Sequence, residues 1–361
     1  MSLRALLDNL RIPIVQAPMA GASTPQMALA VSRAGGLGSV AAAAFAPDEI
    51  EAAAALVRSG TDAPFAVNLL VSASSSPEPE MLDRALERLR PWYEALGATL
   101  PEPPNRFAQD FDAQFEATLR AAPPIASFAF DMISRERIAA LKSAGSYVVG
   151  TANTVAEAKA WAEAGADGIC AQGMEAGGHR GNFLADVDDS LIGTMPLVAT
   201  VLAAVDLPVI AAGGIMDGRG VAATLALGAG AAQMGSAFLA SDQAITGTIW
   251  QTAIREAPDD PTRLTRAFSG RFARGLENRF TREMRSVERD VPAYPVQNRL
   301  TQPLRAAAAK VGDPDMMSLW AGQAVKLAQP GDAGEMVKHW WAQAQETAQA
   351  LAAQTAARRR S

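Results

Sequence analysis

Short apolar runs alternate along the chain with amphipathic, alanine-rich runs. An apolar run bounded by turn residues predicts a buried strand, and apolar positions three and four apart predict a helix. The predicted strands are residues 12–19, 37–42, 65–71, 125–130, 147–151, 168–172, 208–213 and 231–238. Between them we predict a helix beginning at Thr24-Pro25 and helices over 47–60, 134–144, 154–165 and 220–228. Strands alternating with helices in this way favour a closed parallel barrel over an open sheet.

Three stretches of the chain depart from this alternation. Residues 72–122 are rich in Pro, Glu and Arg and too long for one crossover helix, so we expect a helical excursion over the top of the barrel. From about Leu239 the pattern changes to longer helices joined by loops, and residues 320–354 predict a final helix. The sequence therefore predicts the α/β class: a (β/α)8 TIM barrel over 1–239, an appended helical and loop subdomain over 240–318 on the substrate side, above the active site, and a C-terminal helix within 319–361 that packs back on the barrel.

Composition and charge exclude several classes of function. The net charge of −6 provides no field that would attract nucleic acid. No apolar stretch approaches the roughly 20 residues needed to span a bilayer, and the N-terminus lacks the apolar core of a signal peptide. We therefore expect a cytoplasmic protein with no membrane or nucleic-acid partner. One cysteine and two histidines exclude a disulfide and disfavour a metal site, so any redox chemistry requires an organic cofactor.

Amides and glycines gather where the predicted strands end, which in such a barrel is the mouth that carries the chemistry. Asn68 and Gln172 can each donate to and accept from the polar edge of a heterocycle, although either residue alone is also typical of a loop cap. Gly213 and Gly214 follow one strand, and Gln233, Met234, Gly235 and Ser236 end the next. A single glycine pair is compatible with a tight turn alone. Two such loops on adjacent strands favour a phosphate site built from backbone N–H groups.

His179 is the predicted catalytic residue. It follows Gly177 and Gly178 in a polar segment that does not resemble core, and an imidazole suits proton transfer at neutral pH. The competing interpretation is a loop histidine that only bonds backbone. His339 lies in a predicted helix and is interpreted as a surface or packing residue, and Cys170 as a small buried hydrophobe.

One motif favours a different fold when it is read alone. Gly218-x-Gly220-x-x-Ala223 opens a helix, and Asp242 follows at a spacing typical of a dinucleotide-binding fingerprint. The preceding strand–helix units and the absence of a fingerprint turn joining strand to helix disfavour a Rossmann domain.

Four segments resemble the nitronate monooxygenase family, formerly called 2-nitropropane dioxygenases, of the bacterial class I type. They are PIVQAPMAGASTPQMALAVSRAGGLGSV from Pro13, PFAVNLL from Pro64, AQGMEAGGHRG from Ala171 and LPVIAAGGIMDGRGVAATLALGAGAAQMGSAFL from Leu207. The resemblance covers most of the chain. It implies that FMN is held by these strand ends, with the turn Ala17-Pro18-Met19 near the flavin ring, and that His179 is the active-site histidine. It also implies that a nitronate, and in some cases a nitroalkane, reacts with O2 to give a carbonyl compound and nitrite.

The chain departs from this family near the substrate. Studied members place tyrosines and a lysine there, partly in the segment after a Tyr-Pro pair, and by register Asn298 and Gln302 replace a tyrosine and the lysine. Nitronate preference therefore does not follow from the barrel motifs alone. Related barrels also serve as NAD(P)H-dependent FMN reductases of quinones or enoyl thioesters, which is the alternative function, and a non-catalytic FMN-binding protein is a third. The expected quaternary state is a monomer or a homodimer.

Overall fold

Eight parallel strands form the central sheet of the computed structural model, which describes residues 2–72 and 77–359. Their order around the sheet is β1-β9-β8-β6-β5-β4-β3-β2, and a parallel bridge between Val15 and Leu37 brings the first and last strands together. The strands are β1 (Ile14–Gln16), β2 (Gly38–Ala41), β3 (Phe65–Leu70), β4 (Ile125–Ala129), β5 (Tyr147–Ala152), β6 (Gly168–Gln172), β8 (Val209–Ala212) and β9 (Ala231–Met234). The predicted (β/α)8 barrel is confirmed, and the Rossmann alternative is wrong.

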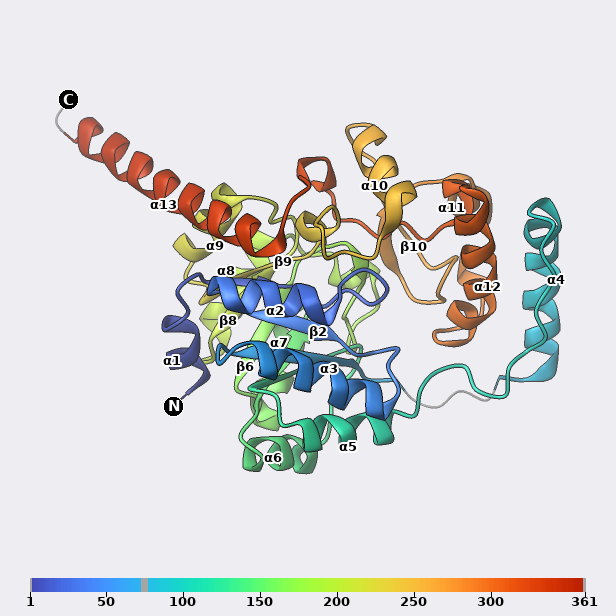
Figure 1. The fold of residues 1–361 in the computed structure, drawn as a ribbon, viewed down its shortest axis with the longest axis horizontal. Helices are drawn as coiled ribbons and strands as arrows, with labels where there is room; N and C mark the ends of the chain where they lie inside the picture. Colours follow the sequence, from blue (N-terminus) through green and yellow to red (C-terminus); the bar gives the residue numbers. More distant parts are fainter. Residues whose placement is uncertain (1, 73–76, 360–361) are drawn as a thin grey trace.

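A ring of helices covers the outside of the barrel (Figure 1). It consists of α2 (Pro25–Ala34), α3 (Pro47–Gly60), α5 (Phe111–Ala121), α6 (Arg135–Ser143), α7 (Val155–Ala164), α8 (Thr194–Ala204) and α9 (Gly218–Ala226). Local sequence sets their ends: the Thr24 and Thr154 side chains cap α2 and α7, and Gly35 and Gly165 end these helices in the left-handed conformation. Apolar side chains of strands and helices form one continuous core between the two layers.

The N-terminal end of the barrel is plugged by α1 (Leu3–Asp8). Leu3 and Leu7 are buried in a cluster with residues of the strands, among them Ile125 and Cys170. Burial raises the pKa of the Cys170 thiol to about 12, which keeps it protonated. The interpretation of Cys170 as a small buried hydrophobe is confirmed, and the polar end of the barrel is the opposite one.

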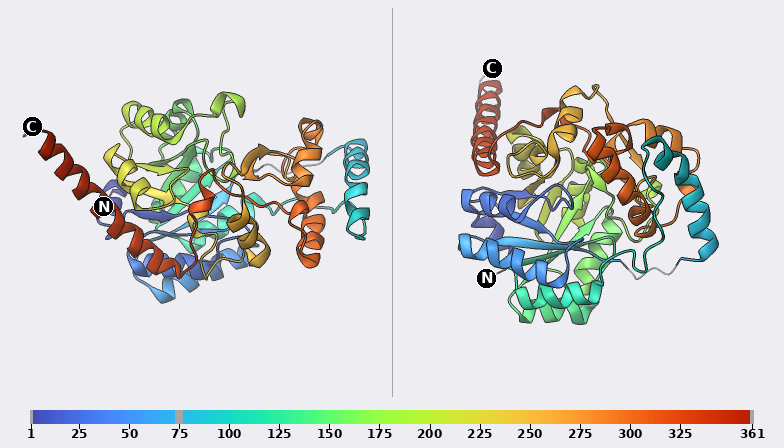
Figure 2. Two further views of the ribbon diagram at one scale, coloured as in Figure 1. Left: turned by 90° about the horizontal axis from the view of Figure 1, so that it is seen from above. Right: turned by 45° about the vertical axis from the view of Figure 1, so that its right-hand side comes forward.

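A helical part stands beyond one end of the barrel, with α4 (Pro79–Ala95) outermost (Figures 1 and 2). It contains α10 (Gly247–Glu256), α11 (Arg279–Met284) and α12 (Val296–Val311). Residues of α4, α11 and α12 share one apolar core, and the Tyr93 hydroxyl donates to Leu300 O at 2.7 Å. The excursion over 72–122 therefore divides: α4 joins the appended part, while α5 packs against α3 on the barrel wall. Residues 73–76 of the excursion lie outside the described residues.

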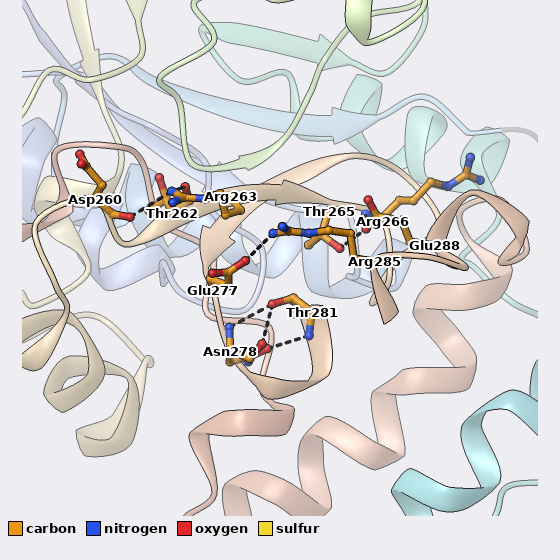
Figure 3. Close-up of polar contacts among 10 residues, drawn as sticks. All are labelled: Asp260, Thr262, Arg263, Thr265, Arg266, Glu277, Asn278, Thr281, Arg285 and Glu288. Carbon is orange, nitrogen blue, oxygen red and sulfur yellow. Dashed lines mark hydrogen bonds and ion pairs between the residues drawn. The ribbon is translucent and has the colours of Figure 1, made fainter. Parts of the chain in front are cut away.

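The appended part also contains a small antiparallel sheet that the pattern of helices and loops did not predict. Its order is β10-β11-β7, formed by β10 (Thr262–Thr265), β11 (Ala273–Leu276) and β7 (Gly178–His179). Figure 3 shows the polar contacts beside β10 and β11: the Glu277–Arg285 ion pair, the Glu288 carboxylate accepting from Thr265, and Asn278 capping α11. The sheet attaches the segment after β6 to the appended part.

The last helix, α13 (Ala333–Arg358), begins later than the predicted start near Trp320. Its N-cap is Asp332, whose carboxylate accepts from the N–H groups of Gly334 and Glu335, and Pro330-Gly331 precede it. The first half packs on α9 and α2, and the second half projects away from the body (Figures 1 and 2). Short 3-10 turns are η1 (Asp188–Ser190), η2 (Ser236–Phe238), η3 (Glu288–Asp290), η4 (Pro314–Met316) and η5 (Val325–Leu327). Across the described ranges, no helix combines the length and apolar character needed to cross a membrane.

Candidate active site

The barrel strands surround a cavity that is lined mainly by apolar side chains, with a few polar ones among them. Pro18, Asn68, Ser127 and Gln233 line it, together with Thr151 from β5. The Asn68 amide donates to Ser127 Oγ at 3.0 Å, and the Gln233 amide approaches Cys170 Sγ at 3.4 Å. Among the described residues, neither side-chain carbonyl oxygen, Asn68 Oδ1 nor Gln233 Oε1, accepts a hydrogen bond. The structure thus brings two of the predicted amides together and leaves their acceptors available to a ligand.

Gln172, the third predicted amide, has a different environment. Its Oε1 accepts from Asn153 Nδ2 and from Gly181 N, both at 2.9 Å. Its Nε2 donates to the backbone carbonyl of His179 at 3.1 Å. Gln172 therefore fixes the path of the segment that carries His179, whatever further contact it makes with a ligand.

A second group of predicted residues forms a backbone surface that we call the glycine cradle: Gly177, Gly214, Gly235 and Ser236. Within residues 2–72 and 77–359, the N–H groups of the three glycines donate to no protein acceptor. Gly213 and Gly214 have φ values of 117° and 70°, which glycine adopts without strain. Unpaired N–H groups at adjoining strand ends are suited to a phosphate.

The cradle has one wall that the sequence did not indicate, the segment 320–323. Gly322 N donates to Ser236 Oγ at 2.8 Å, and Gln323 N donates to Glu175 O at 3.0 Å. A Cβ on Gly177 would lie 2.5 Å from Ala321 C and Gly322 N, so the two chains pass too closely for a side chain. Because Ser236 Oγ accepts from Gly322, its own proton is free to point elsewhere.

His179 lies in β7, where it pairs with Ala273 of β11, so its backbone is held in a sheet rather than in a flexible loop. The imidazole Nε2 lies 2.9 Å from Ser269 Oγ. The ring meets Phe130, Tyr294 and Trp320, with centroid distances of 5.4, 5.8 and 5.5 Å. We call these four side chains the aromatic cluster. Three separate regions of the chain enclose the histidine.

The charge around His179 is positive. Burial, followed by the nearby charges of Arg271 and Arg305, lowers the pKa of His179 to about 3. The imidazole is therefore neutral at physiological pH. It can accept a proton or exchange a hydrogen bond with Ser269, but it does not supply a positive charge of its own.

Asn298 and Gln302, the two departures from the family pattern, face different surroundings on α12. Asn298 is partly buried, and its Oδ1 accepts from Arg305 Nη2 at 2.9 Å. Gln302 is exposed and accepts from Arg299. Asn298 thus contacts an arginine seven residues further along the helix, whereas Gln302 contacts Arg299 at the exposed surface.

Several residues of the site were not predicted from the sequence. Phe130 ends a predicted strand and has a φ of 83°. Its position at a strand end could therefore have indicated that it lies at the mouth of the barrel. Ser269, Arg271, Arg305 and Trp320 lie far from His179 in sequence and in no motif. Conversely, His339 is an exposed residue of α13 that lines a separate groove with Asp217 and Trp340, as its surface interpretation required.

Fold and site together define a (β/α)8-barrel enzyme with a glycine cradle and a neutral histidine at its mouth. A family model described as nitronate monooxygenase matches residues 4–342, and the chain belongs to this family of oxidoreductases. A probable nitronate monooxygenase of Staphylococcus aureus (strain Newman) is 40% identical over 321 residues, covering 89% of this chain and 90% of the relative.

Three solved structures are similar to this chain. A nitroalkane oxidase from Streptomyces ansochromogenes has 43% identity and a TM-score of 0.88, covering 96% of this chain and 99% of its own. FabK from Thermotoga maritima has 30% identity and a TM-score of 0.75. The match covers 98% of this chain and 99% of FabK. The enoyl reductase domain of MlnA from Bacillus amyloliquefaciens shares the fold, with 11% identity and a TM-score of 0.58. The match covers 97% of this chain and 98% of that domain.

Proposed function

We propose that this protein is an FMN-dependent nitronate monooxygenase that uses O2 to convert a nitronate into a carbonyl compound and nitrite. The observation that carries the proposal is the neutral imidazole of His179, held by aromatic side chains two residues from the glycine cradle. Family membership and the similarity to a nitroalkane oxidase support the same reaction.

The residues at the barrel mouth fit FMN. The glycine cradle would bind the phosphate through backbone N–H groups, with Ser236 donating its hydroxyl proton. Asn68 and Gln233 would pair with the polar edge of the flavin ring, and the turn Ala17-Pro18-Met19 would lie against its face. Gln172, Gly178, Gly213 and Met234 complete the proposed cofactor-binding set. Bound FMN supplies an electron acceptor for the nitronate and reactivity toward O2.

His179 and its neighbours determine which substrate form can react. A nitronate already carries the negative charge that a nitroalkane acquires only by losing a proton, so its oxidation requires no base. A neutral nitroalkane requires one, and an imidazole whose pKa lies near 3 is a weak base at neutral pH. We therefore infer that nitronates are preferred to nitroalkanes, and that His179 chiefly orients the substrate and exchanges a proton with Ser269.

The proposal is tested with purified protein loaded with FMN. We expect O2 consumption and nitrite release with propionate 3-nitronate, and His179→Asn should lose activity on nitroalkanes while retaining bound flavin. Absence of turnover with any nitronate would contradict the proposed reaction. An unchanged rate in the variant would reject the role of His179.

The alternative reaction is NAD(P)H-dependent reduction of a quinone or enoyl thioester. The fold shared with the MlnA enoyl reductase domain is compatible with it, but at this identity the fold alone is shared. Anaerobic mixing with NADH separates the two functions, because rapid flavin bleaching is expected only of a reductase.

A further inference from the structure

Arg271 lies at one side of the aromatic cluster. Its guanidinium sits over the Phe130 ring, 4.1 Å from the centroid. Nε donates to Arg180 O at 2.9 Å and Nη2 donates to Asn182 O. Among the described residues, Nη1 has no hydrogen-bond acceptor and the side chain forms no ion pair. Nε and Nη2 therefore hold the segment 180–182, and Nη1 remains available to a ligand.

Arg305 lies between the two segments that carry Tyr294 and Trp320. Nη2 donates to Asn298 O and Oδ1 at 2.8 and 2.9 Å, four residues after Tyr294. Nη1 donates to Ser318 Oγ at 3.2 Å, two residues before Trp320. Nε is directed to Thr301 O at 3.3 Å. Every acceptor is neutral, and within the described residues no carboxylate pairs with this cation.

The absence of a counter-ion distinguishes Arg305 from the other buried arginines. Arg180 has the charges of Glu157 and Glu175 nearby, Arg271 has those of Glu157 and Asp131, and Arg274 has that of Glu175. Tyr93 and Tyr294 are the titratable groups that raise the pKa of Arg305, and no carboxylate of the described residues is among them. A guanidinium held in low dielectric without an opposite charge is costly, and a bound anion would remove that cost.

We propose that Arg271 and Arg305 bind the planar anionic group of the substrate between them, against His179, with Asn298 and Ser318 holding the Arg305 guanidinium in place. We call Arg271 and Arg305 the arginine pair. The ligand class is a small planar oxyanion, of which the nitronate group is an example. The inference rests on the proposed function, because it assigns the residues that recognise the nitronate in that same site.

Gln302 is not the residue that places a positive charge near His179. The family pattern places a lysine at that position of the substrate segment, but here Gln302 is exposed and bonded to Arg299. Arg305, held through Asn298, supplies a positive charge from the same helix. On α12 of this chain the positive charge near His179 is therefore that of a guanidinium held by Asn298, which is more rigid than a lysine amine.

The test measures binding of nitrate, a planar monoanion that resembles the nitronate group but cannot be oxidised. Its dissociation constant is measured by titration calorimetry on the FMN-loaded protein. We expect Arg305→Met and Arg271→Met each to weaken nitrate binding by about 10- to 100-fold, the range for losing a charge-assisted hydrogen bond. Arg305→Lys should bind with intermediate strength. Arg299→Gln, an exposed change on the same helix, should bind like the wild type.

Kinetics give a second measurement. Arg305→Met should raise KM for a nitronate by a similar factor and leave KM for the uncharged nitroalkane nearly unchanged. Wild-type nitrate affinity in both Met variants, or no nitrate binding by the wild-type protein, would overturn the arginine pair. Loss of nitrate binding in the variants supports the arginine pair as an anion site, whether or not a nitronate is oxidised. If nitrate binds but no nitronate is oxidised, only the proposed function is contradicted. If Arg305→Met does not fold, Arg305→Lys and Arg271→Met still decide the outcome.

Discussion

The chemistry of the site depends on how single residues are solvated. His179 and Arg305 are both partly buried polar groups, but burial affects them differently because only the imidazole can release its proton near neutral pH. The histidine becomes neutral, whereas burial lowers the pKa of Arg305 only to about 10, so it stays charged. The site consequently combines a neutral hydrogen-bonding ring with fixed positive charge.

The depressed pKa of His179 predicts a particular pH dependence of stability. The unfolded chain binds a proton at this residue below pH 6.5, but the folded chain does so only below about pH 3. Stability should therefore fall as the pH falls from 6.5 toward 3, by at most about 1.4 kcal/mol per pH unit from this residue. Urea unfolding of wild type and His179→Asn between pH 4 and 7.5 measures the difference.

His179→Asn should show the smaller pH dependence in this range. Other groups that titrate there contribute equally to both proteins and cancel in the comparison. If the free energy of unfolding depends on pH in the same way in both proteins, His179 keeps an ordinary pKa in the fold. The conclusion that its imidazole is neutral because of burial would then be wrong.

At the level of elements, two short segments complete the mouth of the barrel. The sheet β10-β11-β7 fixes the backbone of His179, and segment 320–323 forms a wall of the glycine cradle. β10, β11 and segment 320–323 come from the chain after the last barrel strand, whereas β7 follows β6. Neither has the length or periodicity that identifies an element in sequence, since β7 spans only Gly178–His179.

Gly322 tests the role of the 320–323 segment. A Cβ at this position would lie 2.9 Å from Glu175 O and 3.2 Å from Ser236 Oγ, so Gly322→Ala must displace the segment from the cradle. We expect FMN affinity to fall by about 10-fold or more, as for the loss of a hydrogen bond to a charged group. Flavin fluorescence titration measures this affinity.

Gly230→Ala is the matched control, because its nearest neighbour is the flexible end of Leu7 at 3.3 Å, at the opposite end of the barrel. It should bind FMN normally. Equal FMN affinity in Gly322→Ala and wild type would show that segment 320–323 takes no part in the cofactor site.

On the scale of the whole molecule, the barrel is braced by the first half of α13. Trp340 is buried against Phe238, with ring centroids 5.0 Å apart, and Gln343 Oε1 accepts from Gly218 N at 2.7 Å. From residue 348 to 359 every residue is exposed. The family match ends at residue 342, close to the point where the helix leaves the body.

Removal of residues 348–361 should therefore leave the free energy of unfolding and FMN content nearly unchanged. Trp340→Ala removes a buried aromatic side chain from the same helix. It should lower the free energy of unfolding by about 3–5 kcal/mol. Chemical unfolding of both variants makes the comparison. A truncated protein as unstable as the Trp340→Ala variant would show that the projecting half of α13 has a structural role.

The residues near the strand ends show how far sequence alone determined this protein. The alternation of strands and helices predicted the barrel, since hydrophobic periodicity is a local property and parallel strands must be covered on both faces. Asn68, Gly214, Gln233 and His179 were identified because the ends of such strands converge by geometry. Local capping chemistry also set helix ends such as that of α2 at Thr24.

Only the tertiary structure brought together the groups that surround His179. Ser269, Arg271, Arg305 and Trp320 come from segments more than 80 residues beyond it, and a long-range contact leaves no periodicity in the chain. The pKa of His179 likewise depends on burial and on those charges, and neither exists until the appended part has folded onto the barrel. The sequence identified the residues of the proposed site, and the packing of distant segments decided the charge around them.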